Sequence, residues 1–112
     1  MIEKKFKFNY NLYNDEINKI KDDLTLENFI KCMFKSYGAE NKYNLKLSLF
    51  VFITDRKYCM DNYSIDNIRV KALDVMIYYL CYKLNSTDDN LRNGMLKSWE
   101  DFKNLNIRII DL

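Results

Sequence analysis

The sequence predicts a small two-layer α+β domain in which three to four helices cover one face of a three-stranded sheet. Three observations support this prediction. Residues 2–12 alternate between apolar and polar side chains, residues 43–54 form a second and stronger alternating run, and segments with helical periodicity lie between and after them. A chain of 112 residues has the size of one domain, so we expect a single domain over 1–112.

The first strand is expected at residues 2–12. Lys5 and Lys7 share one face with Glu3, Asn9 and Asn11, which is typical of an edge strand protected against aggregation. The other face is apolar, with period two: Ile2, Phe6, Phe8, Tyr10 and Leu12.

Two helical pieces are expected next, with a joint near Thr25. Asn14 is a candidate N-cap of the first, short piece, and Thr25 of the second. Gly38 stands where a helix needs a left-handed residue after its C-terminus. The buried stripe of the second piece is predicted to be Leu26, Phe29, Ile30, Met33 and Tyr37.

The run from Tyr43 to Thr54 is predicted to be the central strand. One side, expected to be covered by the helices, has Leu45, Leu47, Leu49, Val51 and Ile53, and the other has Lys46, Ser48, Phe50 and Phe52. Its second half is apolar on both faces, which indicates at least partial cover on each side. The alternative is an all-α helical bundle in which residues 43–58 form a buried helix, because periodicity alone does not always assign short apolar runs.

A core helix is expected over 65–84, capped by Ser64, because its polar side chains, Arg69 and Lys83 excepted, are confined to a narrow stripe. The turn at 85–89 then opens a last helix, and Gly94 in its middle indicates a bend or close helix packing. A short third strand is expected at 107–112. The polar stripe of the core helix is Asn67, Lys71, Asp74, Tyr78 and Cys81, and the buried stripe of the last helix is Leu91, Met95, Trp99 and Phe102.

Residues that carry chemistry are scarce. The chain has no histidine, and its cysteines, Cys32, Cys59 and Cys81, lack metal-ligand spacing. Cys59 lies in a segment interpreted as irregular, close to Lys57, whose charge can lower a thiol pKa. The ordinary interpretation of Cys59 is a loop cysteine with no role, so we expect no catalytic residue, no metal and no cofactor, and a protein that is not an enzyme.

Composition predicts where the protein acts. The first residues have no signal-peptide run, and no stretch reaches the roughly 18 apolar residues of a membrane span. An odd number of cysteines argues against a disulfide framework. We therefore expect a cytoplasmic protein, in the producing cell or in an infected host cell, that does not bind membranes. Heavy use of Asn, Ile, Lys and Tyr indicates an A/T-rich genome.

The leading functional hypothesis is a non-enzymatic protein-binding domain, such as an inhibitor, an immunity protein or a viral or phage accessory factor. If helices cover one sheet face, Phe50 and Phe52 point away from them, on the side of Lys5 and Lys7. An exposed apolar patch of this kind usually marks an interface with a partner or with a second copy. The predicted partner-binding residues are Phe50, Phe52, Lys5, Lys7, Lys46, Tyr78 and Tyr82. The two phenylalanines could also be ordinary core.

Single-stranded nucleic acid is the alternative partner for the same sheet face, because aromatic rings flanked by lysines can stack bases and hold phosphates. Residues 46–53 resemble the RNP1 stretch of RNA-recognition motifs at Lys46, Phe50 and Val51. Ser48 and Ile53 stand where that motif has stacking aromatic residues, and both of its glycines are absent. The resemblance covers eight residues and implies base stacking by Phe50.

Overall fold

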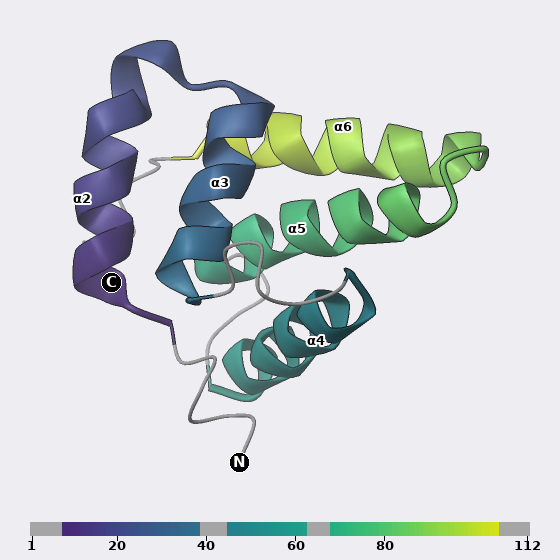
Figure 1. Ribbon diagram of the computed structural model, residues 1–112, viewed down its shortest axis with the longest axis horizontal. Coiled ribbons are helices and arrows are strands. Elements are labelled where there is room, and N and C mark those ends of the chain that lie inside the picture. The colour runs from purple at the N-terminus through teal and green to yellow at the C-terminus, as the bar shows by residue number, and fades with distance from the viewer. Residues whose placement is uncertain (1–7, 39–44, 63–67, 106–112) are drawn as a thin grey trace. The chain divides into compact units, whose positions relative to one another are not determined.

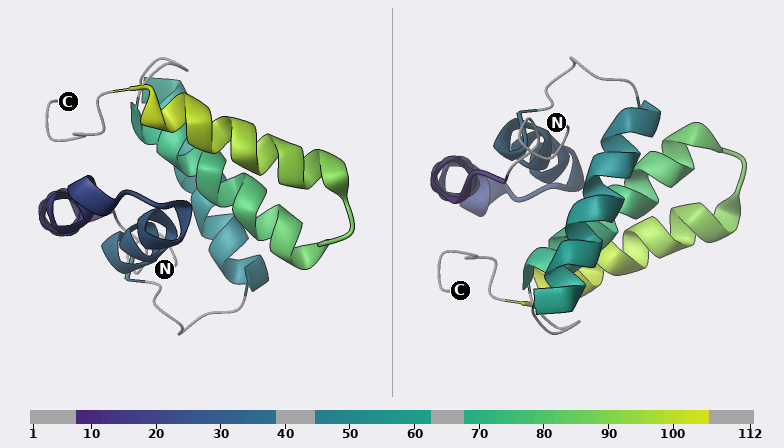
Figure 2. Two further views of the ribbon diagram at one scale, coloured as in Figure 1. Left: turned by 90° about the horizontal axis from the view of Figure 1, so that it is seen from above. Right: turned by 90° about the horizontal axis from the view of Figure 1, so that it is seen from below.

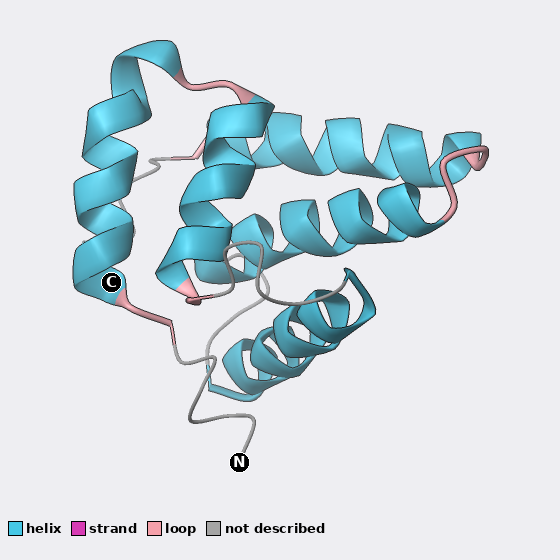
Figure 3. Ribbon diagram, viewed as in Figure 1, coloured by secondary structure: helices cyan, strands magenta, loops and turns pink. Residues whose placement is uncertain are grey.

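The computed structural model describes residues 8–38, 45–62 and 68–105, and all of its regular structure there is helical (Figure 1). Figure 3 shows no strand in these three segments. The predicted α+β fold with a three-stranded sheet is therefore wrong. The helices are α2 (Tyr10–Ile20), the short 3-10 helix η1 (Lys21–Asp23), α3 (Leu26–Ser36), α4 (Leu45–Asn62), α5 (Ile68–Leu84) and α6 (Asp89–Lys103).

The predicted central strand is the helix α4. The segment misleads because apolar side chains occur on all sides of it, so the pattern fits a two-sided strand and a helix equally well. It also has no glycine or proline to interrupt a helix. In the helix, Phe50 and Phe52 point to opposite sides: Phe50 is 51% exposed and Phe52 is 0% exposed.

The predicted first strand is wrong over its last residues. Asn9 caps α2, and its side-chain oxygen accepts a hydrogen bond of 3.0 Å from the backbone N–H of Leu12. The helix thus starts at Tyr10, and Asn14, the predicted cap, lies inside it. Residues 1–7 and the predicted third strand at 107–112 are outside the described residues.

The chain divides into two compact units, and the described residues 8–38 belong to the first. In this unit α2 and α3 pack as a helical hairpin joined by η1. The ring of Phe8 lies 5.6 Å from the ring of Tyr13 and 5.1 Å from that of Tyr37, between centroids. The backbone N–H of Asn9 donates to the carbonyl oxygen of Ser36 at 2.9 Å. These contacts hold the start of α2 against the end of α3.

The predicted joint near Thr25 is confirmed. The hydroxyl of Thr25 accepts a hydrogen bond from the N–H of Asn28 at 3.1 Å and so caps α3. Gly38 has φ 67°, the left-handed conformation expected after the helix end, and its N–H donates to the carbonyl of Lys35 at 3.0 Å. Of the predicted stripe, Phe29, Ile30, Met33 and Tyr37 are buried and Leu26 is half-buried.

Residues 45–62 and 68–105 belong to the second unit, in which α5 packs against both α4 and α6. Figure 2 shows α4 crossing α5, while α5 and α6 run side by side from the turn that joins them. The prediction that α5 is a core helix ending at Leu84 is confirmed, whereas its predicted cap Ser64 lies outside the described residues. Its buried residues are Ile68, Arg69, Val70, Ala72, Leu73, Val75, Met76 and Leu80.

The last helix also follows its prediction. The carboxylate of Asp88 accepts hydrogen bonds from the N–H groups of Asn90 and Leu91, at 2.9 and 3.3 Å, and so caps α6. Met95, Trp99 and Phe102 are buried, and Leu91 is half-buried. The rings of Trp99 and Phe102 stack with centroids 6.0 Å apart.

Candidate functional site: the outer face of α4

Two ion pairs set the rotation of α4 about its own axis. Arg69 of α5 forms a two-pronged pair with Asp55: its Nη2 lies 2.7 and 2.8 Å from the two carboxylate oxygens, and its Nε lies 3.2 Å from one of them. Arg56 of α4 donates from its Nε to the carboxylate of Asp74 on α5. Since both pairs join the same two helices, they determine which side of α4 faces α5.

The inner face of α4 is part of the core. Its buried residues are Ser48, Val51, Phe52 and Cys59. The prediction that Cys59 lies in an irregular loop is wrong, because the residue is in the fourth turn of a helix and fully buried. Burial raises the pKa of the Cys59 thiol to about 11, so the thiol is protonated at neutral pH. The shift is opposite to the lowering of the thiol pKa that a nearby lysine such as Lys57 can cause.

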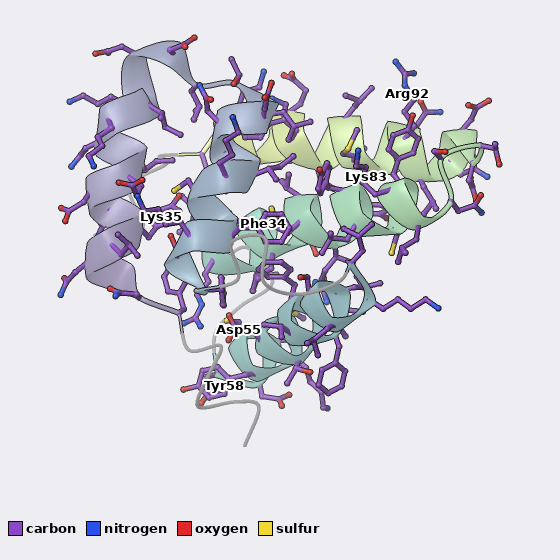
Figure 4. The ribbon with its side chains drawn as sticks, viewed as in Figure 1. Phe34, Lys35, Asp55, Tyr58, Lys83 and Arg92 are labelled. Carbon is purple, nitrogen blue, oxygen red and sulfur yellow. The ribbon has the colours of Figure 1, made fainter. Side chains whose placement is uncertain are left out.

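The opposite side of α4 exposes three large apolar side chains. Phe50 is 51% exposed, Ile53 is 47% exposed and Tyr58 is 53% exposed. Figure 4 shows Asp55 and Tyr58 on α4, with Asp55 on the side that pairs with α5. Most large apolar side chains of α5 are buried, so this concentration on one helix distinguishes α4.

Charged side chains frame this apolar region. Lys46, Phe50, Ile53 and Lys57 recur at intervals of four, three and four residues, which places them in one stripe along the helix. We call this surface the outer face of α4. It consists of Lys46, Phe50, Ile53, Thr54, Lys57 and Asp61, all exposed, with Tyr58 at its edge.

The predicted partner-binding residues do not form one surface in the structure. Phe50 and Lys46 lie together on the outer face of α4, whereas Phe52 is buried on the inner face. Tyr78 and Tyr82 belong to α5, where Tyr78 is 39% exposed and Tyr82 is half-buried. Lys5 and Lys7 lie outside the described residues.

Sequence reasoning missed Ile53, Lys57, Tyr58 and Asp61. Their signal was the recurrence of exposed positions every three or four residues, which has meaning only if the segment is a helix. The strand interpretation placed Ile53 on the face covered by helices, and the predicted strand ended before Lys57. The error in secondary structure therefore caused the error in the site.

The other titratable groups offer little chemistry. Burial raises the pKa of Cys32 to about 12 and also raises that of Cys81. Within 8–38, 45–62 and 68–105, no three cysteine or acidic side chains converge as metal ligands would. No helix among the described residues is both long and apolar enough to span a membrane.

Comparisons of the chain with models of protein families, with curated proteins and with solved structures give no match.

Proposed function

We propose that this protein is a protein-binding domain that acts without catalysing a reaction, and that the outer face of α4 is its contact surface. The observation that carries the proposal is the exposure of Phe50, Ile53 and Tyr58, each about half exposed, on one helix. Such a domain would act as an inhibitor, an immunity protein or an accessory factor does, by covering part of a partner.

The energetics of interfaces support this assignment. Burial of a large apolar side chain contributes roughly 1.5–3 kcal/mol, so leaving three of them in water forgoes stabilisation that a partner can recover. Aromatic anchors such as Phe50 are typical of the centre of an interface, and charged residues of its rim. Lys46, four residues before Phe50, has this rim position.

The helix also presents these side chains in a way that partners recognise. Phe50 and Ile53 are three residues apart and so lie on one side of the helix, as anchors that enter a groove or pack against another helix do. The Arg69–Asp55 and Arg56–Asp74 pairs hold α4 in place before any partner arrives. Such preorganisation lowers the entropic cost of binding.

The nucleic-acid alternative loses its geometric basis. It required Phe50 and Phe52 side by side on a sheet face, whereas Phe52 is buried and the segment is a helix. The resemblance of residues 46–53 to RNP1 depended on the same strand. We therefore do not propose nucleic acid as the partner.

Site-specific photo-crosslinking in the producing cells tests the proposal. We would place benzoylphenylalanine at position 50, and at position 84 as the matched control. Leu84 is 43% exposed, similar to Phe50, but belongs to α5. We expect protein adducts from position 50 that position 84 does not give. Equal labelling from the two positions would show that the outer face of α4 is not a specific contact.

A second variant separates binding from folding. Because Phe50 and Ile53 are exposed, F50S/I53S should change the unfolding midpoint little. The same variant should abolish crosslinking from a benzoylphenylalanine placed at position 58. A variant that unfolds would mean that these side chains belong to the core, which would contradict the proposal.

A further inference from the structure

The outer face of α4 has a symmetry in its sequence that identifies a partner for it. Along the sequence, the midpoint of Lys46 and Asp61 falls between Ile53 and Thr54. The midpoint of Phe50 and Lys57 falls at the same place. The α-helix rises by a constant 1.5 Å per residue, so residues at equal distances from a midpoint face each other when two copies of a helix run antiparallel. We propose that the outer face of α4 binds the same face of a second copy of this chain, with the two helices antiparallel, an inference that rests on the proposed function of this face.

The charges on the face complement each other in this arrangement. Lys46 of each chain lies opposite Asp61 of the second copy, which gives two equivalent ion pairs. Both side chains are exposed, and neither has an ion-pair partner among the residues that the structure describes. A parallel arrangement would instead place Lys46 against Lys46, so the charges select the antiparallel one.

The apolar residues match as well. Ile53 of one chain lies opposite Thr54 of the second copy, next to the two-fold axis, so both Ile53 side chains are buried at the centre of the face. Phe50 lies opposite Lys57, whose methylene stem can cover the ring while its ammonium group stays near the ring face. A two-fold interface of this kind requires a surface complementary to itself, and the outer face of α4 meets that requirement.

The helix dipole supplies an independent argument. A helix favours acidic residues in its first turn and basic residues in its last turn, yet α4 has no acid in the first and no base in the last. It has Lys46 near its start and Asp61 near its end, so both charges are unfavourable for their own helix. Beside an antiparallel copy, Lys46 lies at the negative end of the other helix and Asp61 at the positive end, where each charge is favourable.

Sedimentation equilibrium of the full chain, at about 150 mM salt, tests the proposal with charge-reversed variants. The wild-type chain should sediment at twice its mass of 13.6 kDa at high concentration. K46D and D61K each place like charges opposite each other at two positions, so each should weaken the dimer about tenfold. The exposed α6 variant K97D should leave it unchanged.

Mixing the two variants gives the sharpest result. In a heterodimer of K46D with D61K, opposite charges face each other again at both ends of the interface. We therefore expect the mixture to regain wild-type dimerisation, and the double variant K46D/D61K to regain it alone. Single variants that dimerise as well as wild type, or a mixture that does not recover, would overturn the antiparallel register.

The two proposals fail in different ways. A wild-type chain that stays monomeric at 1 mM, roughly the weak limit of specific association, would overturn the dimer. If position 50 still crosslinks to other proteins in the same cells, the binding function stands and the partner is a different chain. If position 50 gives no adduct beyond those of position 84, the proposed function fails as well.

Discussion

Gly94 of α6 lies directly against the aromatic ring of Tyr78 on α5. A β-carbon at position 94 would stand less than 3.0 Å from three atoms of that ring, a distance that real side chains essentially never show. Gly38 is the glycine with positive φ among the described residues, so Gly94 is needed for its missing side chain and not for an unusual backbone. The sequence predicted a bend or close packing at Gly94, and close packing is confirmed.

This contact predicts that the effect of one substitution on the free energy of unfolding changes sign when the Tyr78 ring is removed. Alanine is favoured over glycine inside a helix by about 1 kcal/mol, but in G94A the new methyl group must displace the Tyr78 ring. We expect G94A to lower the free energy of unfolding by about 1 kcal/mol. In a Y78A background the same change should raise it by about 1 kcal/mol. Urea unfolding followed by the fluorescence of Trp99, the only tryptophan, measures both.

The double-mutant cycle contains its own control. An interaction energy near 2 kcal/mol between the two positions is expected, because they are in contact. If G94A has the same effect with and without the Tyr78 ring, the close contact is not what requires glycine.

The Arg69–Asp55 pair predicts a large loss of stability when its acid is removed. The side chains are only 8% and 16% exposed, so D55A leaves a buried guanidinium without its carboxylate. We expect the free energy of unfolding to fall by about 3 kcal/mol. The same urea titration measures the change, since Trp99 lies in the same unit.

Two further variants show whether the cause is the unpaired charge. D101A removes the acid of the exposed Lys97–Asp101 pair and should cost less than about 0.5 kcal/mol. D55L/R69M replaces both members by apolar side chains and should be clearly more stable than D55A. A double variant as unstable as D55A would mean that the loss comes from packing.

The start and the end of α3 were predictable from the sequence because their signals are local. Thr25 and Gly38 are identified by the hydrogen bonds and backbone angles that their own neighbours need, and both predictions are confirmed. The amphipathic pattern of α3 and the long apolar run of α5 were also sufficient to predict these two helices. In each case the residues that give the signal lie within a few positions of the structure they determine.

The sheet was predicted wrongly because its evidence was not local. Residues 49–53 are all apolar, so this part of α4 has no polar side to distinguish a helix from a strand, and its packing against α5 decides between them. The Arg69–Asp55 pair was missed for the same reason, since nothing in the sequence relates residues 14 positions apart in different helices. Phe50 was predicted to be exposed because it was placed on an open sheet face. The sheet is absent from the described residues, yet Phe50 is exposed on a helix, and its role in binding stays a prediction.

The opposite orientations of Phe50 and Phe52 predict very different costs of truncation. F52A removes a fully buried ring and should lower the free energy of unfolding by about 3–4 kcal/mol. F50A shortens a side chain that is half in water and should cost less than about 1 kcal/mol. Thermal unfolding monitored by circular dichroism, at one protein concentration, compares them. Similar losses for the two variants would contradict the orientation of α4.

The buried thiol of Cys59 predicts a loss of stability at alkaline pH. Burial raises its pKa from 9.0 to about 11, so below pH 9 the thiol is protonated in the folded and unfolded chains alike and adds no pH dependence. Between pH 9 and pH 11 only the unfolded chain releases the proton. The free energy of unfolding should therefore fall in this window, by about 1 kcal/mol per pH unit from this group.

The C59A variant isolates this contribution. Its free energy of unfolding at pH 8 should be somewhat lower than that of wild type, because a small cavity remains. Its slope between pH 9 and pH 11 should be shallower, since the group that binds the extra proton in the folded state is gone. Urea titrations of both proteins at four pH values, followed by Trp99 fluorescence, give the two slopes. Parallel slopes would mean that the thiol of Cys59 ionises as readily in the folded chain as in the unfolded one, which its burial on the inner face of α4 does not allow.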